Sequence, residues 1–249
     1  ITEEERELLQ GRGVDRALYA SGRAFEVDAA KMLEKGKLMS IRPHTRFAPF
    51  PRHSHNYVEI MYMCRGKTVH RIDGDALVTL EAGELLFLNR HASHAIQRAD
   101  AGDIAVNFIV LPQFFDEAFN MAGVDNVLSR FLLGGLYTGG AAVSYLHFRV
   151  REVLPVQNLV ENMVWTLVNR QPGARRINQV TMGLLLLQLM HYTECIDMSR
   201  NGSIRSPMVE AALREIEENY RAASLTDVAA AFHVGLPYLS AEVKRATGS

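Results

Sequence analysis

The chain has 249 residues, of which 48% are hydrophobic and 22% are charged, and a formal net charge of −1, so it has the composition of a globular protein with one large domain or two smaller ones. No stretch approaches the roughly 18 consecutive apolar residues of a membrane-spanning helix, and the acidic start does not resemble a secretory signal, so we expect a cytoplasmic protein without a membrane partner. The only cysteines, Cys64 and Cys195, argue against a disulfide-stapled domain and a cysteine zinc finger.

Two segments open the chain. Residues 1–36 carry Glu-rich turns separated by glycines, which predicts an N-terminal arm of short helices. Residues 37–112 contain short runs rich in β-branched and aromatic residues that recur about every 8–12 residues between Gly, Pro, Asp and Asn. This spacing predicts a β-barrel or β-sandwich, in which Asp73 and Gly74 mark a hairpin turn.

The next segment, residues 113–195, is predicted to be helical. Residues 153–168 carry one apolar stripe, whereas 177–195 is apolar nearly all round. One face of the second helix can cover the barrel and another is available to a second subunit; the alternative is that both faces are internal core. Trp165, the only tryptophan, is expected to be a packing residue. Residues 196–206 are polar and contain Gly and Ser, which predicts a linker.

Residues 207–249 form the last predicted unit. A leading helix is followed by Ser224 and Asp227, whose spacing is that of a capping box at the start of a second helix. Gly235 lies in the following turn, and Pro237 fits the first turn of a third helix. This order predicts a helix-turn-helix, and a three-helix unit that binds protein rather than DNA is the alternative. The whole chain is therefore predicted to be a mixed β + α protein.

The strongest candidate site is a histidine-rich segment. Alternate side chains of a strand share a face, so His53, His55, Tyr57 and Glu59 are predicted to point together into the barrel. His94, on a later strand, is placed to join them. Because buried polar groups need partners, these side chains must bind one another, a polar small molecule or a metal ion. We favour a small-molecule pocket, since barrel mouths are common ligand sites.

Other polar residues are weaker candidates. His70 and His91 stand alone and are expected at the surface or in loops. Arg71 and Arg98 would hold a carboxylate or sugar hydroxyls if they faced inward. No GxSxG motif and no glycine-rich phosphate loop is present, which leaves nucleophilic catalysis and phosphate transfer without support.

The histidine pattern resembles the signatures of the cupin family. His53, His55 and Glu59 form an HxHxxxE pattern that is followed by Gly66, while Gly83 and His94 match the second signature. Phe47 stands where the first signature usually has glycine. The resemblance implies a cupin-like β-barrel, or jelly roll. In cupins that bind a metal, the ligands are at the positions of His53, His55, Glu59 and His94, and imidazole and carboxylate suit Fe, Mn, Ni or Zn.

The C-terminal segment resembles the first helix-turn-helix of AraC/XylS-family regulators. The matching residues are Ile216, Tyr220, Ser224, Leu225, Val228, Ala229, Val234, Pro237, Tyr238, Leu239, Ser240, Lys244, Thr247 and Gly248. The resemblance implies a cupin-like sensor at 37–112, a dimerisation region at 113–195 and a DNA-binding unit at 207–249. The implied DNA-contacting residues are Pro237, Tyr238, Ser240, Ala241, Lys244 and Arg245. The chain starts without Met and ends before a second helix-turn-helix, so we expect a truncated protein that binds DNA weakly or not at all.

Together these features predict a ligand-responsive bacterial transcription regulator rather than an enzyme. It would form a homodimer through the helical region, bind DNA as an intact protein and take a small-molecule effector, a sugar or related metabolite by family resemblance. No cofactor is required, although His53, His55, Glu59 and His94 would suit a divalent metal. The alternatives are a metal-dependent cupin enzyme, an isomerase or dioxygenase, and a ligand-free dimerisation scaffold.

Overall fold

The computed structural model describes residues 2–20, 22, 24–124, 126–134, 136–138, 141–192, 196–198, 212, 215–216, 224–231 and 235–247. The chain divides into two compact units, Ile1–Arg200 and Asn201–Ser249. The division lies within the stretch that the sequence predicts to be a linker. None of the described helices combines the length and apolarity that crossing a bilayer requires.

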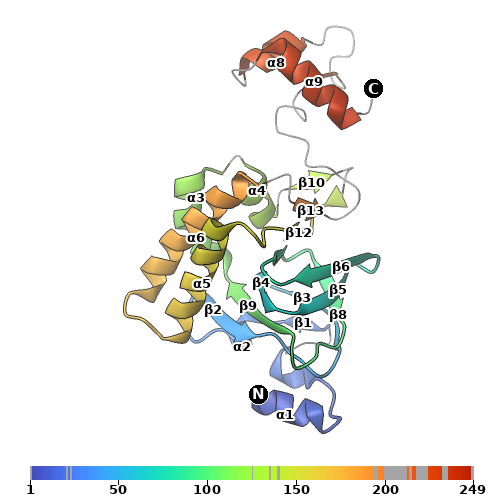
Figure 1. Cartoon of the computed structure of the whole chain (residues 1–249), viewed down its shortest axis with the longest axis vertical. Helices are drawn as coiled ribbons and strands as arrows, with labels where there is room; N and C mark the ends of the chain where they lie inside the picture. Colours follow the sequence, from blue (N-terminus) through green and yellow to red (C-terminus); the bar gives the residue numbers. More distant parts are fainter. Residues whose placement is uncertain are drawn as a thin grey trace. The chain divides into compact units, whose positions relative to one another are not determined.

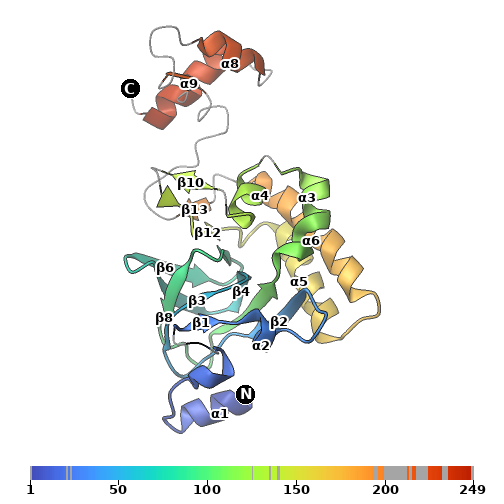
Figure 2. The ribbon, with the colours of Figure 1, turned by 180° about the vertical axis from the view of Figure 1, so that it is seen from behind.

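The first unit contains two β-sheets and a layer of helices (Figures 1 and 2). One sheet has the strand order β1-β3-β8-β5-β6, and its strands are β1 (Glu26–Val27), β3 (Phe50–His55), β8 (Ser93–Ile96), β5 (Lys67–Ile72) and β6 (Ala76–Glu81). The other has the order β13-β12-β7-β4-β9-β2, with β13 (Ile196–Met198), β12 (Tyr145–Phe148), β7 (Leu85–Leu88), β4 (Val58–Arg65), β9 (Ile104–Val110) and β2 (Met39–Pro43). A small hairpin joins β10 (Tyr137–Thr138) to β11 (Ala141–Ala142). The predicted mixed fold with a cupin-like pair of sheets is confirmed at this level.

The barrel core lies between the two sheets. Met61 and Met63 of β4 and Leu86 of β7 pack there with Ile72 and Leu80 from the opposite sheet. The residues of β4 and β7 that point away from this core are buried as well. On this side the Tyr62 hydroxyl of β4 donates a hydrogen bond of 2.7 Å to Gln157 of α5 (Leu154–Val168). A strand that is covered on both faces loses the alternation of apolar and polar residues, which explains the continuous run Leu85–Leu88.

Glycine is required where the loop before β7 meets the loop before α5. Gly83 has φ 83°, and a Cβ atom there would lie 2.8 Å from the Arg151 Cα atom. The glycine therefore supplies both a left-handed backbone and a close approach that a side chain would block. Phe47 has φ 72° at the position where the cupin signature usually has glycine, so the departure in sequence has kept the glycine-like backbone.

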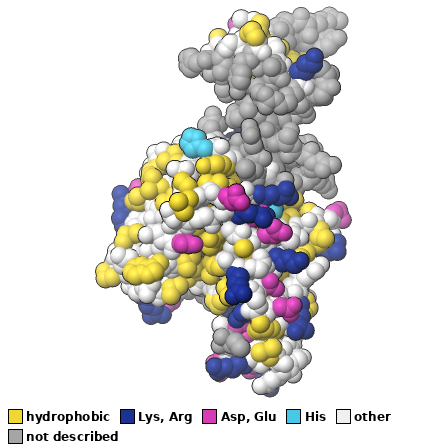
Figure 3. Space-filling view, viewed as in Figure 1, with side chains coloured by type: hydrophobic (Ala, Val, Ile, Leu, Met, Phe, Trp, Pro, Cys, Tyr) yellow, Lys and Arg dark blue, Asp and Glu magenta, His cyan; other side chains and the backbone are white. Residues whose placement is uncertain are grey.

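The helical layer consists of the 3₁₀ turn η2 (Pro112–Phe115), α3 (Asp116–Ala122), α4 (Val127–Leu132), α5 and α6 (Ala174–Met190). All of them lie on one side of the unit in both ribbon views (Figures 1 and 2). The prediction for Trp165 is wrong, since its side chain is 59% exposed on the outer face of α5. Val168 of α5 and Val180 and Leu184 of α6 are exposed too, and hydrophobic side chains gather over this face (Figure 3).

Two segments differ from the expected boundaries. The N-terminal arm contains α1 (Glu3–Leu9), the 3₁₀ turn η1 (Arg16–Leu18) and α2 (Ala29–Met32), but also β1, which pairs in parallel with β3. Residues 196–198, expected at the start of the linker, pair with β12 as the edge strand β13. Both pairings join segments far apart in sequence, and two or three residues give no recognisable alternation.

The second unit contains α8 (Leu225–Ala231) and α9 (Leu236–Thr247). The Ser224 hydroxyl accepts a hydrogen bond of 3.3 Å from the Asp227 amide, which is one half of the predicted capping box. Ala212, Ala229 and Leu239 are buried together, so α8 and α9 share a small apolar core.

Candidate functional site

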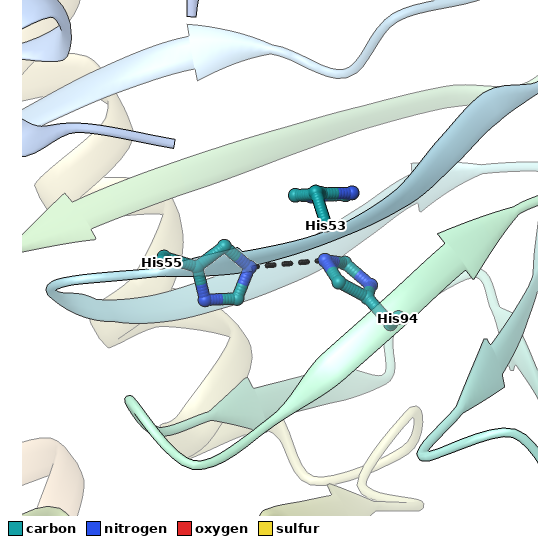
Figure 4. Close-up of side chains that lie close together, drawn as sticks. All are labelled: His53, His55 and His94. Carbon is teal, nitrogen blue, oxygen red and sulfur yellow. Dashed lines mark hydrogen bonds between the residues drawn. The ribbon is translucent and has the colours of Figure 1, made fainter. Parts of the chain in front are cut away.

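Neighbouring strands bring three histidines together in the barrel. His53 and His55 alternate along β3, and His53 lies directly opposite His94 of β8. The Nε2 atoms of His55 and His94 are 3.0 Å apart (Figure 4). All three side chains are buried. The predicted convergence of these histidines therefore arises from the antiparallel register of β3 and β8 (Figure 4).

Glu59 reaches this cluster from the other sheet. The sequence predicts one strand that carries His53, His55, Tyr57 and Glu59, but the chain turns at Asn56 and Tyr57 and passes from β3 to β4. Asn56 fixes this turn, since its Oδ1 atom accepts a hydrogen bond of 2.8 Å from the Ala29 amide. Glu59 Oε2 still lies 3.3 Å from His55 Nε2 and 3.5 Å from His94 Nε2, because the two sheets face each other.

Two further histidines belong to the cluster. The prediction that His70 lies at the surface is wrong, since its side chain is 0% exposed and its ring stacks on that of His94 with centroids 5.8 Å apart. His44 was not singled out by the sequence; its Nδ1 atom is 3.2 Å from Asn107 Oδ1, and Asn107 donates a hydrogen bond of 2.8 Å to Glu59.

One signal in the sequence predicts the burial of His70. In the run Thr68 to Ile72, the alternate residues Thr68, His70 and Ile72 share one face, and all three are buried. His44 has no comparable signal, because it lies just beyond the end of β2 in a polar stretch. His91 is exposed, as predicted.

Burial sets the charge state of the cluster. It lowers the pKa of His53 to about 4 and that of His70 to about 3, and it holds the pKa of His94 well below the ordinary value. For Glu59, burial opposes ionisation, but the imidazoles of His55, His53 and His44 outweigh it and lower the pKa to about 2. At neutral pH the site therefore holds a carboxylate among imidazoles, at least three of which are neutral.

A cavity of about 220 Å³ opens beside this cluster. Of the predicted ligand-binding residues, His53, Tyr57 and Glu59 line it, whereas His55 and His94 are not among its lining residues. The lining residues that the sequence did not single out are Thr2, Glu4, Glu5, Tyr19, Val27, Met32, Arg42, Pro43, His44, Thr45, Phe50, Ile96, Asn107 and Ile109. Both sheets and the N-terminal segment therefore form its walls.

The cluster has the donor atoms of a metal site. His53, His55 and His94 each offer a ligand atom within 4.8 Å of the others. Glu59 Oε2 is buried and lies 3.3 Å from His55 Nε2 and 3.5 Å from His94 Nε2, so it is placed as a fourth ligand. The His53 Nδ1 atom lies 2.9 Å from the Pro51 carbonyl, an arrangement that leaves Nε2 unprotonated for a metal. The four residues thus fit a divalent Fe, Mn, Ni or Zn ion.

The remaining predicted residues lie elsewhere. Arg71 is exposed, and Arg98 is 60% exposed and pairs with Asp100, so neither faces into the barrel. In α9, Pro237, Ser240 and Lys244 are exposed. The side chains of Tyr238, Ala241 and Arg245 lie outside the described residues.

Residues 40–119 match the family model described as the AraC-like ligand binding domain, which confirms the predicted resemblance for this segment. No curated protein matches the sequence. Among solved structures, the chain is similar to an apo variant of ToxT from Vibrio cholerae, at 11% identity over 86% of this chain and 78% of that chain, with a TM-score of 0.48. Unsaturated fatty acid bound ToxT from the same species gives 13% identity over 83% and 72%, with a TM-score of 0.43. A cupin protein from Bacteroides fragilis gives 28% identity over 29% and 64%, with a TM-score of 0.25.

Proposed function

We propose that this chain, whose residues 40–119 match the AraC-like ligand binding domain, is a ligand-responsive transcription regulator that binds a small molecule in its barrel cavity. The observation that carries the proposal is the cavity itself, because it lies largely within the matched segment and combines apolar walls with a polar floor at His53 and Glu59. The resemblance favours a sugar or related metabolite, whose hydroxyl groups find acceptors and donors in Glu59 and Asn107.

The position of the cavity suggests how binding is transmitted. Its walls include Tyr19, Val27 and Met32 from the N-terminal segment as well as residues of both sheets. A ligand that contacts all of these favours the conformation in which the N-terminal segment rests on the barrel. Such a ligand shifts the population only by its difference in affinity between the two conformations.

The proposed homodimer uses the outer face of α5 and α6. Trp165 and Val168 of α5 and Val180 and Leu184 of α6 are exposed on these helices. Large apolar side chains that gather on one face are typical of an interaction surface. In a symmetric dimer this face would meet its own copy, and ligand binding in each barrel would alter how two DNA-binding units are presented.

DNA binding is assigned to α9 as the recognition helix of a helix-turn-helix, with α8 as its supporting helix. The proposal is supported by the shared core of α8 and α9 and by the exposure of Ser240 and Lys244 on α9. The amino-terminal residues of such a helix read base edges, while nearby cations contact phosphate. Tyr238, Ala241 and Arg245 are proposed contacts from the sequence resemblance alone.

A metal-dependent cupin enzyme, an isomerase or dioxygenase, is the second candidate. It is favoured by the convergence of His53, His55, His94 and Glu59. Metal analysis of the purified protein separates the two functions when it is combined with a turnover screen. Stoichiometric Fe or Mn together with catalytic turnover would support the enzyme, whereas a stably bound metal without turnover would leave the regulator in place.

A thermal-shift screen against a metabolite library tests the proposed sensor. We expect at least one compound to raise the melting temperature of the full chain, and the rise to be smaller in His53→Ala and Glu59→Gln, which alter the cavity floor. His91→Ala is the control, because His91 is exposed and does not line the cavity. A compound that stabilises all variants equally would place its site elsewhere, and a library without any hit would favour a ligand-free scaffold.

A further inference from the structure

The only arginine among the described residues of the cavity wall forms no ion pair with any described carboxylate. Arg42 lies in β2 and is half-buried, and it lines the cavity. Its Cζ atom lies 5.4 Å from the centre of the Tyr19 ring, and its Nη1 atom is 2.7 Å from the Met32 sulfur. A thioether sulfur is a weak acceptor, so most of the five guanidinium donors lack a good acceptor among the residues that the structure describes.

The carboxylates near Arg42 are engaged elsewhere. Glu5 forms an ion pair with Arg46 at 2.6 Å, and Glu4 accepts a hydrogen bond from the Tyr19 hydroxyl. Glu59 accepts a hydrogen bond from Asn107 and lies beside the histidine cluster. Within the described part of the chain, no carboxylate forms an ion pair with Arg42. A partly buried guanidinium in a ligand cavity is therefore open to an anionic partner from outside the chain.

From these contacts we infer that the effector is a small organic monocarboxylate whose carboxylate binds Arg42. This inference rests on the proposed function and names the ligand class of the same cavity. The planar fork of arginine matches a carboxylate through two parallel hydrogen bonds. Asn107 lies directly opposite Arg42 in the pairing of β2 with β9 and also lines the cavity, so it is placed to contact the next polar group of the ligand.

The charge and size of the cavity narrow the class further. Arg42 is the only Lys or Arg among the described residues that line the cavity, whereas Glu4 and Glu59 each contribute a negative charge. A dianion such as a phosphate monoester would therefore be repelled more strongly than a monoanion. An apolar cavity of about 150 Å³ holds benzene. The present cavity of about 220 Å³ therefore suits a monocarboxylate of about six to thirteen non-hydrogen atoms. Sugar acids and aromatic or aliphatic acids both meet these limits.

The test compares acids with neutral analogues of the same shape by isothermal titration calorimetry of the full chain. The probes are glucuronate with glucose, benzoate with benzamide, and hexanoate with hexanamide. We expect at least one acid to bind at least about tenfold more tightly than its neutral analogue, the factor that one charge-assisted contact supplies. This comparison needs no variant and so does not depend on whether a substitution folds.

Variants then locate the contact. Arg42→Gln is expected to weaken binding of the acid at least about tenfold and to leave the neutral analogue unchanged, while Arg42→Lys falls between, because it keeps the charge but loses the fork. Arg71→Gln is the matched control, since Arg71 is exposed and outside the cavity. Equal binding of acid and neutral analogue, acid binding that is unchanged in Arg42→Gln, or no binding of any acid overturns the inference. Tight binding of glucose in all variants would overturn it and leave the sensor function standing, whereas a failed metabolite screen would remove both.

Discussion

Acidification should destabilise the first unit strongly, because its buried histidines stay neutral while the same residues in the unfolded chain take up protons. The unfolded histidine pKa is about 6.5. In the folded protein the pKa of His53 is about 4 and that of His70 about 3, and that of His94 is well below the ordinary value. Below pH 6.5 the unfolded state therefore binds more protons than the folded state, so the free energy of unfolding falls as the pH falls.

The size of the effect follows from these pKa values. At pH 5.5 His53 and His70 are almost fully neutral in the folded state and about nine-tenths protonated in the unfolded state. Each then contributes about 1.4 kcal/mol of destabilisation, or about 3 kcal/mol together, and His94 acts in the same direction. Domains of this size have total stabilities of about 5–15 kcal/mol, so the loss is a large share. Glu59 does not contribute to the loss of stability between pH 7.5 and 5.5. Its pKa is lowered from about 4.5 to about 2, so the stability that its ionised form contributes is lost only as the pH falls from about 4.5 to about 2.

Urea unfolding followed by circular dichroism at pH 7.5, 6.5 and 5.5, with a chelator present, measures this loss. A variant without one buried imidazole, His70→Leu, should lose about 1.4 kcal/mol less stability over the same range, whereas His91→Ala should behave like the wild type. A free energy of unfolding that changes by less than about 1 kcal/mol between pH 7.5 and 5.5 would refute the argument that these histidines are buried in the neutral form.

Three further substitutions test other parts of the account. Gly83→Ala should lower the free energy of unfolding by more than the roughly 1–2 kcal/mol that a left-handed backbone costs, because its Cβ atom would meet Arg151. Gly74→Ala is the control in the same unfolding assay: it has open space around it and should show the conformational cost alone. Phe47→Gly should change the stability by less than about 1 kcal/mol, since relief of the left-handed backbone offsets the lost ring contacts; a loss of about 3 kcal/mol or more would contradict this balance. Trp165→Glu should convert the proposed dimer to a monomer, as measured by analytical ultracentrifugation, and should have little effect on the free energy of unfolding of the monomer. If the dimer persists, the interface does not lie on α5.

The barrel and its histidines were accessible to sequence reasoning because local patterns encode them. Regular strand spacing and the alternation of His53 and His55 depend only on neighbouring residues. Their contact with His94 depends on strand pairing; the sequence placed His94 beside them from its position on a later strand, and the cupin resemblance then implied that it is a ligand. The turn at Asn56 was missed because the alternating strand pattern continues through Glu59. Asn56 holds the turn through a hydrogen bond from the Ala29 amide, and Ala29 lies far away in the sequence.

The rest of the cavity could not be predicted from local patterns. Tyr19, Val27 and Met32 come from a segment that the sequence predicts as a separate helical arm, and they reach the cavity only because β1 pairs with β3. Arg42 lies in a strand whose facing depends on its register with β9. Trp165 was expected to be a packing residue because of its spacing along the helix, but this spacing does not show whether its face of the helix is covered by another part of the chain.

The cavity between the barrel and the N-terminal segment is the proposed effector site, and a substitution that fills this cavity tests the assignment most directly. Ile96 lines the cavity, and Leu77 is an exposed residue of β6 outside it, so Ile96→Trp and Leu77→Trp form a matched pair. The measurement is the affinity of both variants for the tightest ligand of the metabolite screen, with circular dichroism as the check on folding. We predict that Ile96→Trp weakens binding at least about tenfold while Leu77→Trp leaves it unchanged. A folded Ile96→Trp variant with wild-type affinity would contradict the account.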